Sequence, residues 1–243
     1  MEKLKVILRK IFYPRDLTCS ICKRESFSGK TVCERCESSL PFNGKSICGR
    51  CGRPTAYPIE YCDYCKNKTF SVDFSRSVFR YEEPISKLIR RLKYDGEKYL
   101  ADELADRMKV VFLRSIGYAD GIVYIPAEVQ KKKDRGYNQG QLLAVALSEK
   151  ISVPVLEGAV EKVKSTSSQV GLSVKERMAN LKGSFAVKNK SLVKGKRILV
   201  VDDVMTTGST LETVAERLKS AGASEVVALT VASVELRNLK NSR

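Results

Sequence analysis

The chain has 243 residues, of which 43% are hydrophobic, and a formal net charge of +16 with no histidine. This length suits one large or two small domains with a real core, and the missing histidine excludes histidine-based metal binding and catalysis. No apolar run approaches the roughly 20 residues of a membrane helix, and the basic N-terminus lacks the apolar core of a secretory signal. We therefore expect a cytoplasmic protein without a membrane span. The positive charge favours anionic partners such as nucleic acid, anionic lipid or a phosphorylated substrate, with a merely basic, solvated surface as the alternative.

Residues 1–16 are expected to form a short amphipathic helix that ends at Pro14. The apolar face of this helix would consist of Leu4, Ile7, Leu8, Ile11 and Phe12. Such a helix either docks on the rest of the protein or lies on a membrane surface, and the sequence leaves both interpretations open.

All eight cysteines fall within residues 17–66 as four CxxC pairs. The pairs are Cys19/Cys22, Cys33/Cys36, Cys48/Cys51 and Cys62/Cys65. Each CxxC turn places two sulfurs on one side of a knuckle, and two knuckles complete a tetrahedral zinc site. Because the segment has few large apolar residues, metal would supply its folding energy. We predict a double zinc ribbon over residues 17–68 with two structural Zn²⁺ sites. Disulfides and redox pairs compete less well, since nothing indicates export.

Two features of the ribbon segment remain open. The CxxC pairs either join in chain order or cross-brace, first with third and second with fourth. The basic side chains either bind nucleic acid or a partner, or they only decorate a scaffold. These side chains are Lys23, Arg24, Lys30, Arg35, Lys45, Arg50 and Arg53.

A linker and a strand over residues 67–83 are expected next, followed by a helical region from Pro84 to about Ile116. The apolar stripe of this region is interrupted at Tyr94-Asp95-Gly96. Lys93 borders the break and either reaches an anionic ligand or belongs to a solvated face. Aromatic side chains suited to stacking bases, with ordinary packing as the alternative, are Tyr81, Tyr94, Tyr99 and Tyr137.

Alternating strands and helices follow, which is typical of a parallel sheet. Residues 121–126, GIVYIP, predict the first strand of a ligand-binding sheet, and residues 226–231 and Phe185–Val187 are expected to complete it. Between them, residues 131–139, KKKDRGYNQ, predict a cationic loop that leads into a helix. Residues 164–169 are expected to form a polar loop, Ser173 and Glu176 a helix-capping box, and the last nine residues a basic tail.

The most specific pattern is ILVVDDVMTTGST over residues 198–210. Its four aliphatic residues predict a strand buried on both faces, with Asp202 and Asp203 at the strand's end. A loop of small and hydroxyl residues leads into a helix, where Ser209 and Glu212 have the spacing of a capping box. A glycine-bearing loop and unpaired helix amides suit a phosphate, and two acids suit ribose hydroxyls or a divalent cation. The pattern therefore indicates a 5-phosphoribosyl ligand, and the cationic loop would face the same crevice.

This stretch resembles the signature of type I phosphoribosyltransferases, which bind phosphoribosyl pyrophosphate (PRPP). With the CxxC pairs, residues 135–144 (RGYNQGQLLA) and a series of spaced residues, the whole chain resembles the ComF family of bacterial competence-associated proteins. The spaced residues are Thr166, Gln169, Leu172, Arg177, Asn180 and Phe185. The resemblance implies an α/β fold of the type I phosphoribosyltransferase class, with a Rossmann-like parallel sheet over residues 69–243. A double zinc ribbon would precede this domain.

The resemblance also implies Mg²⁺-dependent PRPP binding and a role in DNA uptake during natural transformation. Single-stranded DNA would be a ligand, and other DNA-uptake or recombination proteins would be candidate partners. Carried onto this chain, Asp202 and Asp203 would be catalytic and hold the ribose or Mg²⁺. Lys93 and Arg177 would contact nucleic acid or pyrophosphate. PRPP would be bound by Val204, Met205, Thr206, Thr207, Gly208, Ser209, Thr210, Lys132 and Arg135.

Three functions remain open from the sequence. The first is a DNA-handling competence factor that binds PRPP and single-stranded DNA. The second is an active phosphoribosyltransferase with an unidentified acceptor, which PRPP turnover dependent on Asp202 and Asp203 would distinguish. The third is a PRPP sensor without chemistry, for which PRPP binding would alter DNA affinity without turnover.

Overall fold

The computed structural model describes residues 18–26, 31–66, 68–164, 181 and 183–235. The chain divides into two compact units, residues 1–40 and 41–243. Several predicted features lie outside the described residues: the helix over residues 1–16, the capping box of Ser173 and Glu176, the polar loop from residue 165 on, and the basic tail after Glu235.

The first unit contains, in its described part, the short helix α2 (Glu34–Ser38) and an antiparallel bridge between Thr18 and Glu25. Its buried apolar cluster consists of Val32 and two cysteines, Cys19 and Cys36. This cluster buries little apolar surface, so hydrophobic burial alone gives the unit a weak driving force for folding. Metal binding by its cysteines would supply the difference.

A four-stranded parallel sheet organises the second unit, with the strand order β1-β6-β5-β2. The strands are β1 (Phe74–Arg80), β2 (Gly121–Tyr124), β5 (Arg197–Met205) and β6 (Glu225–Ser233). The aliphatic run of β5 is fully buried, as its sequence predicts. β2 pairs with β5 only as far as Val201, whereas β6 pairs with it as far as Met205. The end of β5 therefore extends past its β2 neighbour.

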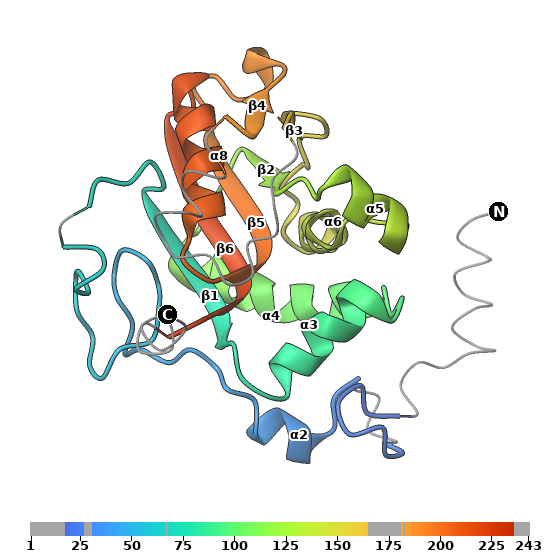
Figure 1. Ribbon diagram of the computed structural model, residues 1–243. Coiled ribbons are helices and arrows are strands. Elements are labelled where there is room, and N and C mark those ends of the chain that lie inside the picture. The colour runs from blue at the N-terminus through green and yellow to red at the C-terminus, as the bar shows by residue number, and fades with distance from the viewer. Residues whose placement is uncertain (1–17, 27–30, 67, 165–180, 182, 236–243) are drawn as a thin grey trace. The chain divides into compact units, whose positions relative to one another are not determined.

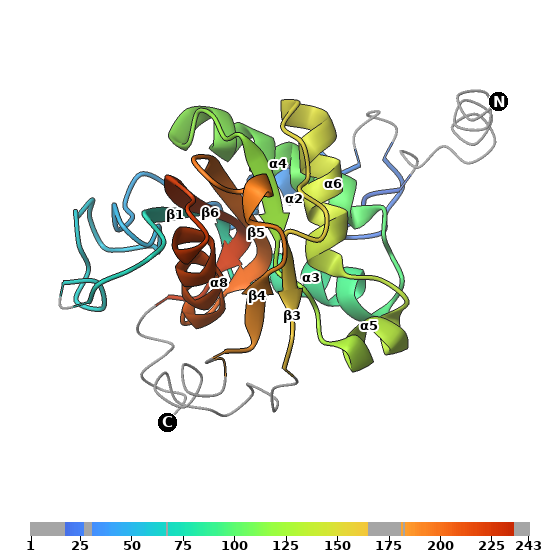
Figure 2. The same cartoon turned by 90° about the horizontal axis from the view of Figure 1, so that it is seen from above.

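Helices cover both faces of this sheet (Figure 1). Seen from above, α8 (Ser209–Ser220) lies on one face, and α4 (Leu100–Ser115) and α6 (Gln139–Ile151) lie on the other (Figure 2). α3 (Ile85–Tyr94) precedes α4, and the break between these two helices falls at the predicted position. The parallel sheet between helical layers confirms the predicted α/β class.

Four local predictions of secondary structure are wrong. Residues 121–126 do not contain the first strand of the ligand-binding sheet, because β1 belongs to the same sheet and precedes β2 in the chain. Phe185–Val187 is β4, which pairs antiparallel with β3 (Val160–Lys162) in a separate two-stranded sheet. The cationic stretch is helical at its start, because α5 (Val129–Arg135) contains good helix formers and ends at Gly136, whose φ is +74°. Finally, the two aspartates lie within β5, which continues to Met205, and not at its end.

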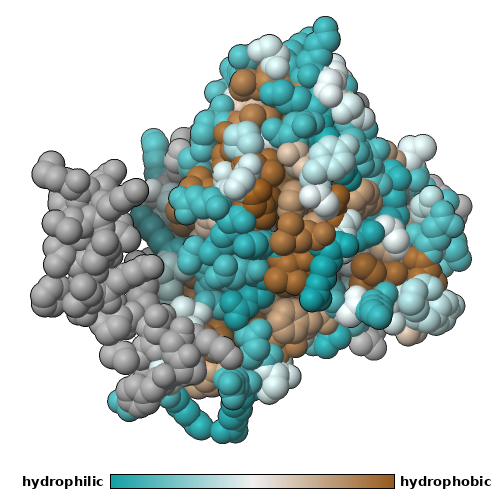
Figure 3. Space-filling view, turned by 180° about the vertical axis from the view of Figure 1, so that it is seen from behind, coloured by the Kyte–Doolittle hydropathy of each residue, from teal (hydrophilic) through white to brown (hydrophobic). Residues whose placement is uncertain are grey.

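The surface of α4 and α6 retains several exposed hydrophobic side chains. These are Val110 and Leu113 on α4 and Val145 on α6. Figure 3, the view opposite to Figure 1, shows hydrophobic surface in patches between hydrophilic side chains. Within the part of the chain that the structure describes, no helix is both long and apolar enough to cross a membrane.

Residues 137–140 fasten α6 to the neighbouring elements. The buried Asn138 amide donates to the carbonyl of Ile125 (3.0 Å), and its Oδ1 accepts from the Gly140 amide (2.9 Å) as the cap of α6. The Tyr137 hydroxyl donates to the Leu92 carbonyl in α3 at 2.5 Å. This part of the predicted cationic loop therefore holds α3, the end of β2 and α6 in fixed relation.

We expect Asn138→Ala to lower the free energy of unfolding by about 2 kcal/mol, because it removes a helix cap and a hydrogen bond to a buried carbonyl. Urea denaturation measures this loss. Asn189→Ala is the matched control, since the exposed Asn189 side chain caps the 3-10 helix η2 (Lys190–Leu192) by accepting from the Ser191 amide at 3.0 Å. Its loss should stay below about 1 kcal/mol, and equal losses in both variants would contradict the role of Asn138.

Candidate functional site

The loop between β5 and α8 combines a tight turn with a helix N-terminus. Gly208 adopts a left-handed φ of +83° and caps α8. The buried hydroxyls of Thr207 and Ser209 are 2.8 Å apart, and the Ser209 amide donates to Thr207 Oγ1 at 3.3 Å. These bonds hold the turn, while the other amides in the first turn of α8 lack acceptors inside the helix. The half-buried Thr206 and Thr210 flank this turn, so the loop offers amides and hydroxyls to an anion.

The predicted capping box of Ser209 and Glu212 is wrong. Ser209 is the first residue of α8, and Gly208, which has no side chain, occupies the cap position. The Glu212 carboxylate instead accepts from the backbone amides of Ser71 and Val72, the second at 3.3 Å. Glu212 therefore connects α8 to the chain segment that leads into β1.

The two aspartates of β5 differ in their surroundings. Asp203 is buried and forms an ion pair with Lys93, the penultimate residue of α3, with Nζ 2.8 Å from Oδ2. Burial acts to lower the pKa of Lys93, but the charge of Asp203 and its hydrogen bond outweigh that effect, and the pKa is raised. Burial, and then the neighbouring charge of Asp203, raise the pKa of Asp202 to about 8. A cation close to Asp202 would favour the ionised form of its carboxyl group.

An exposed aromatic residue stands next to Lys93 at the end of α3. The Tyr94 side chain is 65% exposed, and the Arg135 guanidinium lies over its ring, 4.7 Å from the centroid. Arg135 also donates to the Gln139 side chain at 2.9 Å. Tyr137, by contrast, is buried. Of the four aromatics predicted for stacking, Tyr94 and Tyr81 are exposed.

The described structure contains an open cavity of about 610 Å³ beside the end of β2. Two lysines, Lys133 and Lys162, line it together with Tyr124 and Asn138. Lys162 is paired with Glu128 at 2.8 Å. Of the remaining predicted ligands, the Lys132 side chain and the whole of Arg177 lie outside the described part of the chain. Val204 and Met205 are the last residues of β5, with Val204 half-buried and Met205 buried.

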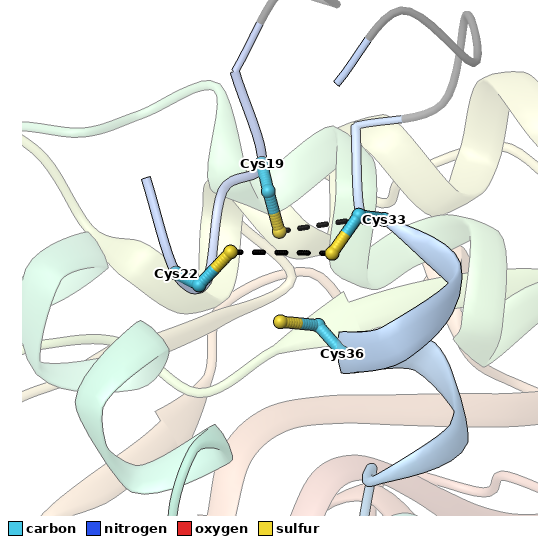
Figure 4. A group of neighbouring side chains, drawn as sticks. All are labelled: Cys19, Cys22, Cys33 and Cys36. Carbon is cyan, nitrogen blue, oxygen red and sulfur yellow. Dashed lines mark hydrogen bonds between the residues drawn. The ribbon is translucent and has the colours of Figure 1, made fainter. Parts of the chain in front are cut away.

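The cysteines gather in two groups of four in chain order, which confirms sequential pairing over cross-bracing. The first group is Cys19, Cys22, Cys33 and Cys36 (Figure 4), and the second is Cys48, Cys51, Cys62 and Cys65. A tetrahedral zinc ion with Zn–S bonds of about 2.3 Å requires sulfurs about 3.8 Å apart. Cys22 and Cys33 sulfurs are separated by 3.9 Å, and Cys51 and Cys62 sulfurs by 3.8 Å. Both groups therefore fit closed, structural zinc sites.

The two groups repeat the same backbone hydrogen bonds. The Cys19 amide donates to Arg24 and the Lys23 amide to Cys19; likewise, the Cys48 amide donates to Arg53 and the Gly52 amide to Cys48. In each group an amide also donates to a sulfur, at 3.4 Å in the first and 3.3 Å in the second. The internal sequence repeat is thus a structural repeat.

Sequence reasoning missed two residues of the second ribbon that contact the β5–α8 loop. Arg53 donates to the carbonyl of Thr206, and the Tyr64 hydroxyl donates to the carbonyl of Thr207 at 3.0 Å. Arg53 is only 1% exposed, although its sequence context suggested one more basic surface side chain. No local pattern predicts these contacts.

Comparison with known proteins identifies two domains in the chain. The model of the double zinc ribbon domain matches residues 8–66, and that of the phosphoribosyl transferase domain matches residues 138–241. Competence protein F of Haemophilus influenzae is 33% identical over 182 residues, covering 72% of this chain and 79% of the relative. DNA utilization protein YhgH of Escherichia coli K12 is 30% identical over 213 residues, 86% of each chain. Competence protein ComFC of Streptococcus pneumoniae is 28% identical over 62% of this chain and 64% of its own length. The predicted fold, a type I phosphoribosyltransferase domain with a double zinc ribbon, is confirmed.

We expect the purified protein to contain two zinc ions per chain, one in each cysteine group. Cys36→Ser and Cys65→Ser should each lower the content to one, because a closed four-thiolate site tolerates the loss of a ligand poorly. Metal analysis by mass spectrometry measures the content. A loss of both ions in either single variant would contradict two independent sites.

We expect Lys93→Met to destabilise the ligand-free protein by about 2–4 kcal/mol, because it leaves the buried Asp203 carboxylate without its partner. Lys87→Met is the matched control on the same helix, since Lys87 pairs with Glu83 at 2.9 Å with both side chains 66% exposed, and it should cost less than about 0.5 kcal/mol. Urea denaturation of a Lys93→Met/Asp203→Asn cycle measures the coupling. Additive losses would rule out a stabilising ion pair.

Proposed function

Since the chain belongs to the ComF family, we propose that it is a DNA-handling protein of DNA uptake that binds PRPP with Mg²⁺ and also binds single-stranded DNA. The observation that carries this proposal is the combination of three features in a chain of net charge +16. They are the β5–α8 loop, the two aspartates of β5, and the exposed Tyr94 with the Arg135 guanidinium over its ring, next to Lys93. The relatives' names, competence protein and DNA utilization protein, support a role with DNA.

In the proposed complex, the β5–α8 loop binds the 5-phosphate of PRPP through amides and through Thr206 and Thr210. The helix N-terminus adds favourable partial charge. Asp202 and Asp203 bind the ribose hydroxyls or Mg²⁺, and their oxygens are the ligands that Mg²⁺ prefers. Lys132, Arg135 and Arg177 serve the pyrophosphate, to which bidentate guanidinium groups are well matched. When bound, Mg²⁺ would neutralise pyrophosphate charge.

Before a ligand binds, the positive charge of Lys93 neutralises the negative charge of Asp203. A diol or a cation that takes over Asp203 must compete with Lys93, whose Nζ lies 2.8 Å away. Once displaced, Lys93 carries its charge toward the remaining anionic part of the ligand. In this proposal, the exchange would bring Lys93 to the pyrophosphate or the nucleic acid.

Single-stranded DNA binding is proposed for the surface around Tyr94 and Arg135. An exposed tyrosine offers a flat face for a base, and the neighbouring guanidinium attracts the phosphate backbone and stacks as well. Lys133, which is exposed and belongs to the same α5 helix as Arg135, adds charge. Other DNA-uptake or recombination proteins that bind the same single-stranded DNA are candidate partners.

The 610 Å³ cavity supports a second candidate function, phosphoribosyl transfer to an acceptor bound there. The acceptor would attack the anomeric carbon and pyrophosphate would leave, with Asp202 and Asp203 holding the ribose. Release of pyrophosphate that depends on both aspartates would establish this activity, and PRPP binding without release would favour a sensor. For either function we propose a cytoplasmic location, where reduced cysteines remain available to zinc.

The first test is titration of zinc-replete protein with a labelled single-stranded oligonucleotide across a salt series, with and without Mg-PRPP. We expect affinity that falls steeply with salt, since cations on the protein release counterions from DNA, and that changes with PRPP. Asp203→Ala should abolish the PRPP effect and keep DNA binding. No binding at low salt would overturn the DNA role.

In the same titration, Tyr94→Ala should weaken DNA binding about 5- to 100-fold, because one stacking contact is lost. Tyr118→Ala is the matched control: Tyr118 is 60% exposed and also carries a guanidinium, that of Arg197, 4.3 Å from its ring centroid. Tyr118 precedes β2, whereas Tyr94 adjoins the ends of the parallel strands through Lys93 and Asp203. Equal losses in both variants would reject the specific role of Tyr94.

A further inference from the structure

Two side chains of the second zinc ribbon, the segment from Cys48 to Cys65, donate hydrogen bonds to successive carbonyl groups of the β5–α8 loop. The Arg53 guanidinium donates to the carbonyl of Thr206, and the Tyr64 hydroxyl donates to the carbonyl of Thr207 at 3.0 Å. Arg53 also lies over the Tyr64 ring, 5.1 Å from its centroid. All four residues belong to the unit over residues 41–243. The two donors come from one ribbon and act on adjacent peptide groups of the loop.

These bonds determine which way the loop amides point. In a trans peptide group the carbonyl and the following amide point in opposite directions. Because the Thr206 carbonyl is bound by the ribbon, the Thr207 amide of the same peptide group points away from the ribbon. The Thr207 carbonyl fixes the Gly208 amide in the same way. An anion-binding loop needs amides toward its ligand and carbonyls turned away, and the ribbon enforces that arrangement from behind.

Arg53 contributes charge as well as geometry. It is 1% exposed, and its Nε and Nη1 atoms have no hydrogen-bond partner among the described residues. Its Nη2 would lie 3.9 Å from a Cβ atom built on Gly208. A buried guanidinium at this distance places positive potential directly beneath the loop, in addition to the partial charge at the start of α8.

The cysteine group holds both donors in place. Tyr64 precedes Cys65, and the Arg53 carbonyl accepts from the Cys48 amide at 2.9 Å. The ribbon is in turn anchored on the sheet, because the Ser75 amide in β1 donates to the Arg50 carbonyl at 2.8 Å. Glu212 closes the connection from the α8 side through Ser71 and Val72. A structural change in the second cysteine group would therefore move Arg53 and Tyr64, and through their hydrogen bonds it would alter the conformation of the loop.

We propose that Arg53 and Tyr64 are positioning residues for the phosphate of PRPP, and that zinc in the second cysteine group maintains the loop in its anion-binding conformation. The proposal rests on PRPP as the ligand of this loop. It gives the second ribbon a role in ligand binding, beyond that of a scaffold. Without zinc, the chain between Cys48 and Cys65 loses the cross-link that fixes both donors.

The test combines two readouts on full-length, zinc-replete protein. Hydrogen exchange measured by mass spectrometry on the ligand-free peptide over residues 204–212 reports the loop, and calorimetric titration with Mg-PRPP reports affinity. Tyr64→Phe deletes one hydroxyl and keeps the ring. We expect severalfold faster exchange in the loop and about fivefold weaker PRPP binding, the effect of one lost hydrogen bond. Arg53→Met should weaken binding by tenfold or more, and Arg53→Lys should restore part of it.

Tyr57→Phe is the matched control, because Tyr57 lies in the same ribbon and is 68% exposed; both readouts should match the wild type. Cys65→Ser, which removes zinc from the second group, should accelerate loop exchange at least as much as Tyr64→Phe. Unchanged loop exchange in Tyr64→Phe and Arg53→Met would overturn the positioning role whatever the ligand. Faster exchange together with no PRPP binding by the wild type would instead overturn the proposed function and support the mechanical link.

Discussion

The unequal pairing of β5 with its two neighbours is the constraint on which the site depends. β6 accompanies β5 to Met205, and β2 leaves it at Val201. Asp202 and Asp203 therefore lie on a strand that is fixed on one side and open on the other. Pairing with β6 fixes the backbone of this stretch, whereas an unpaired loop would leave it mobile. This pairing keeps the stretch rigid, and a ligand of the buried Asp203 would have to displace Lys93.

The segments around this opening are fixed by polar contacts that reach across the chain. Asn138 binds the Ile125 carbonyl just beyond β2, Tyr137 binds Leu92 in α3, and Lys93 binds Asp203. Each contact uses a buried or half-buried polar group, and each has a partner on a different element. Such networks define one arrangement because every alternative leaves a buried polar group unsatisfied. Because these contacts fix α3, its last residue, Tyr94, is held in place although its side chain is exposed.

Local pattern accounts for most of what the sequence predicts correctly, and contacts distant in sequence account for what it misses. The aliphatic run of β5 and the four CxxC pairs each carry their own signal, whether burial on two faces or ligand spacing. Glu212 had the spacing of a cap, but its acceptor atoms serve Ser71 and Val72, which are 141 and 140 residues away. Arg53 reaches a carbonyl 153 residues away. Phe185–Val187 is too short for periodicity to distinguish a central strand from a small separate hairpin.

The two halves of the cysteine repeat differ in one residue of the turn, and this difference reflects how the second half packs against the sheet. Lys23 and Gly52 occupy equivalent positions, and both have positive φ, 62° and 66°. A non-glycine residue bears this conformation at a cost of about 1 kcal/mol, so the turn by itself does not require glycine. At Gly52 a Cβ atom would collide with the carbonyl oxygen of Ser75 in β1. Glycine is therefore required in the second copy by the approach of the sheet. That close approach is also what brings Arg53, the next residue, within reach of the Thr206 carbonyl.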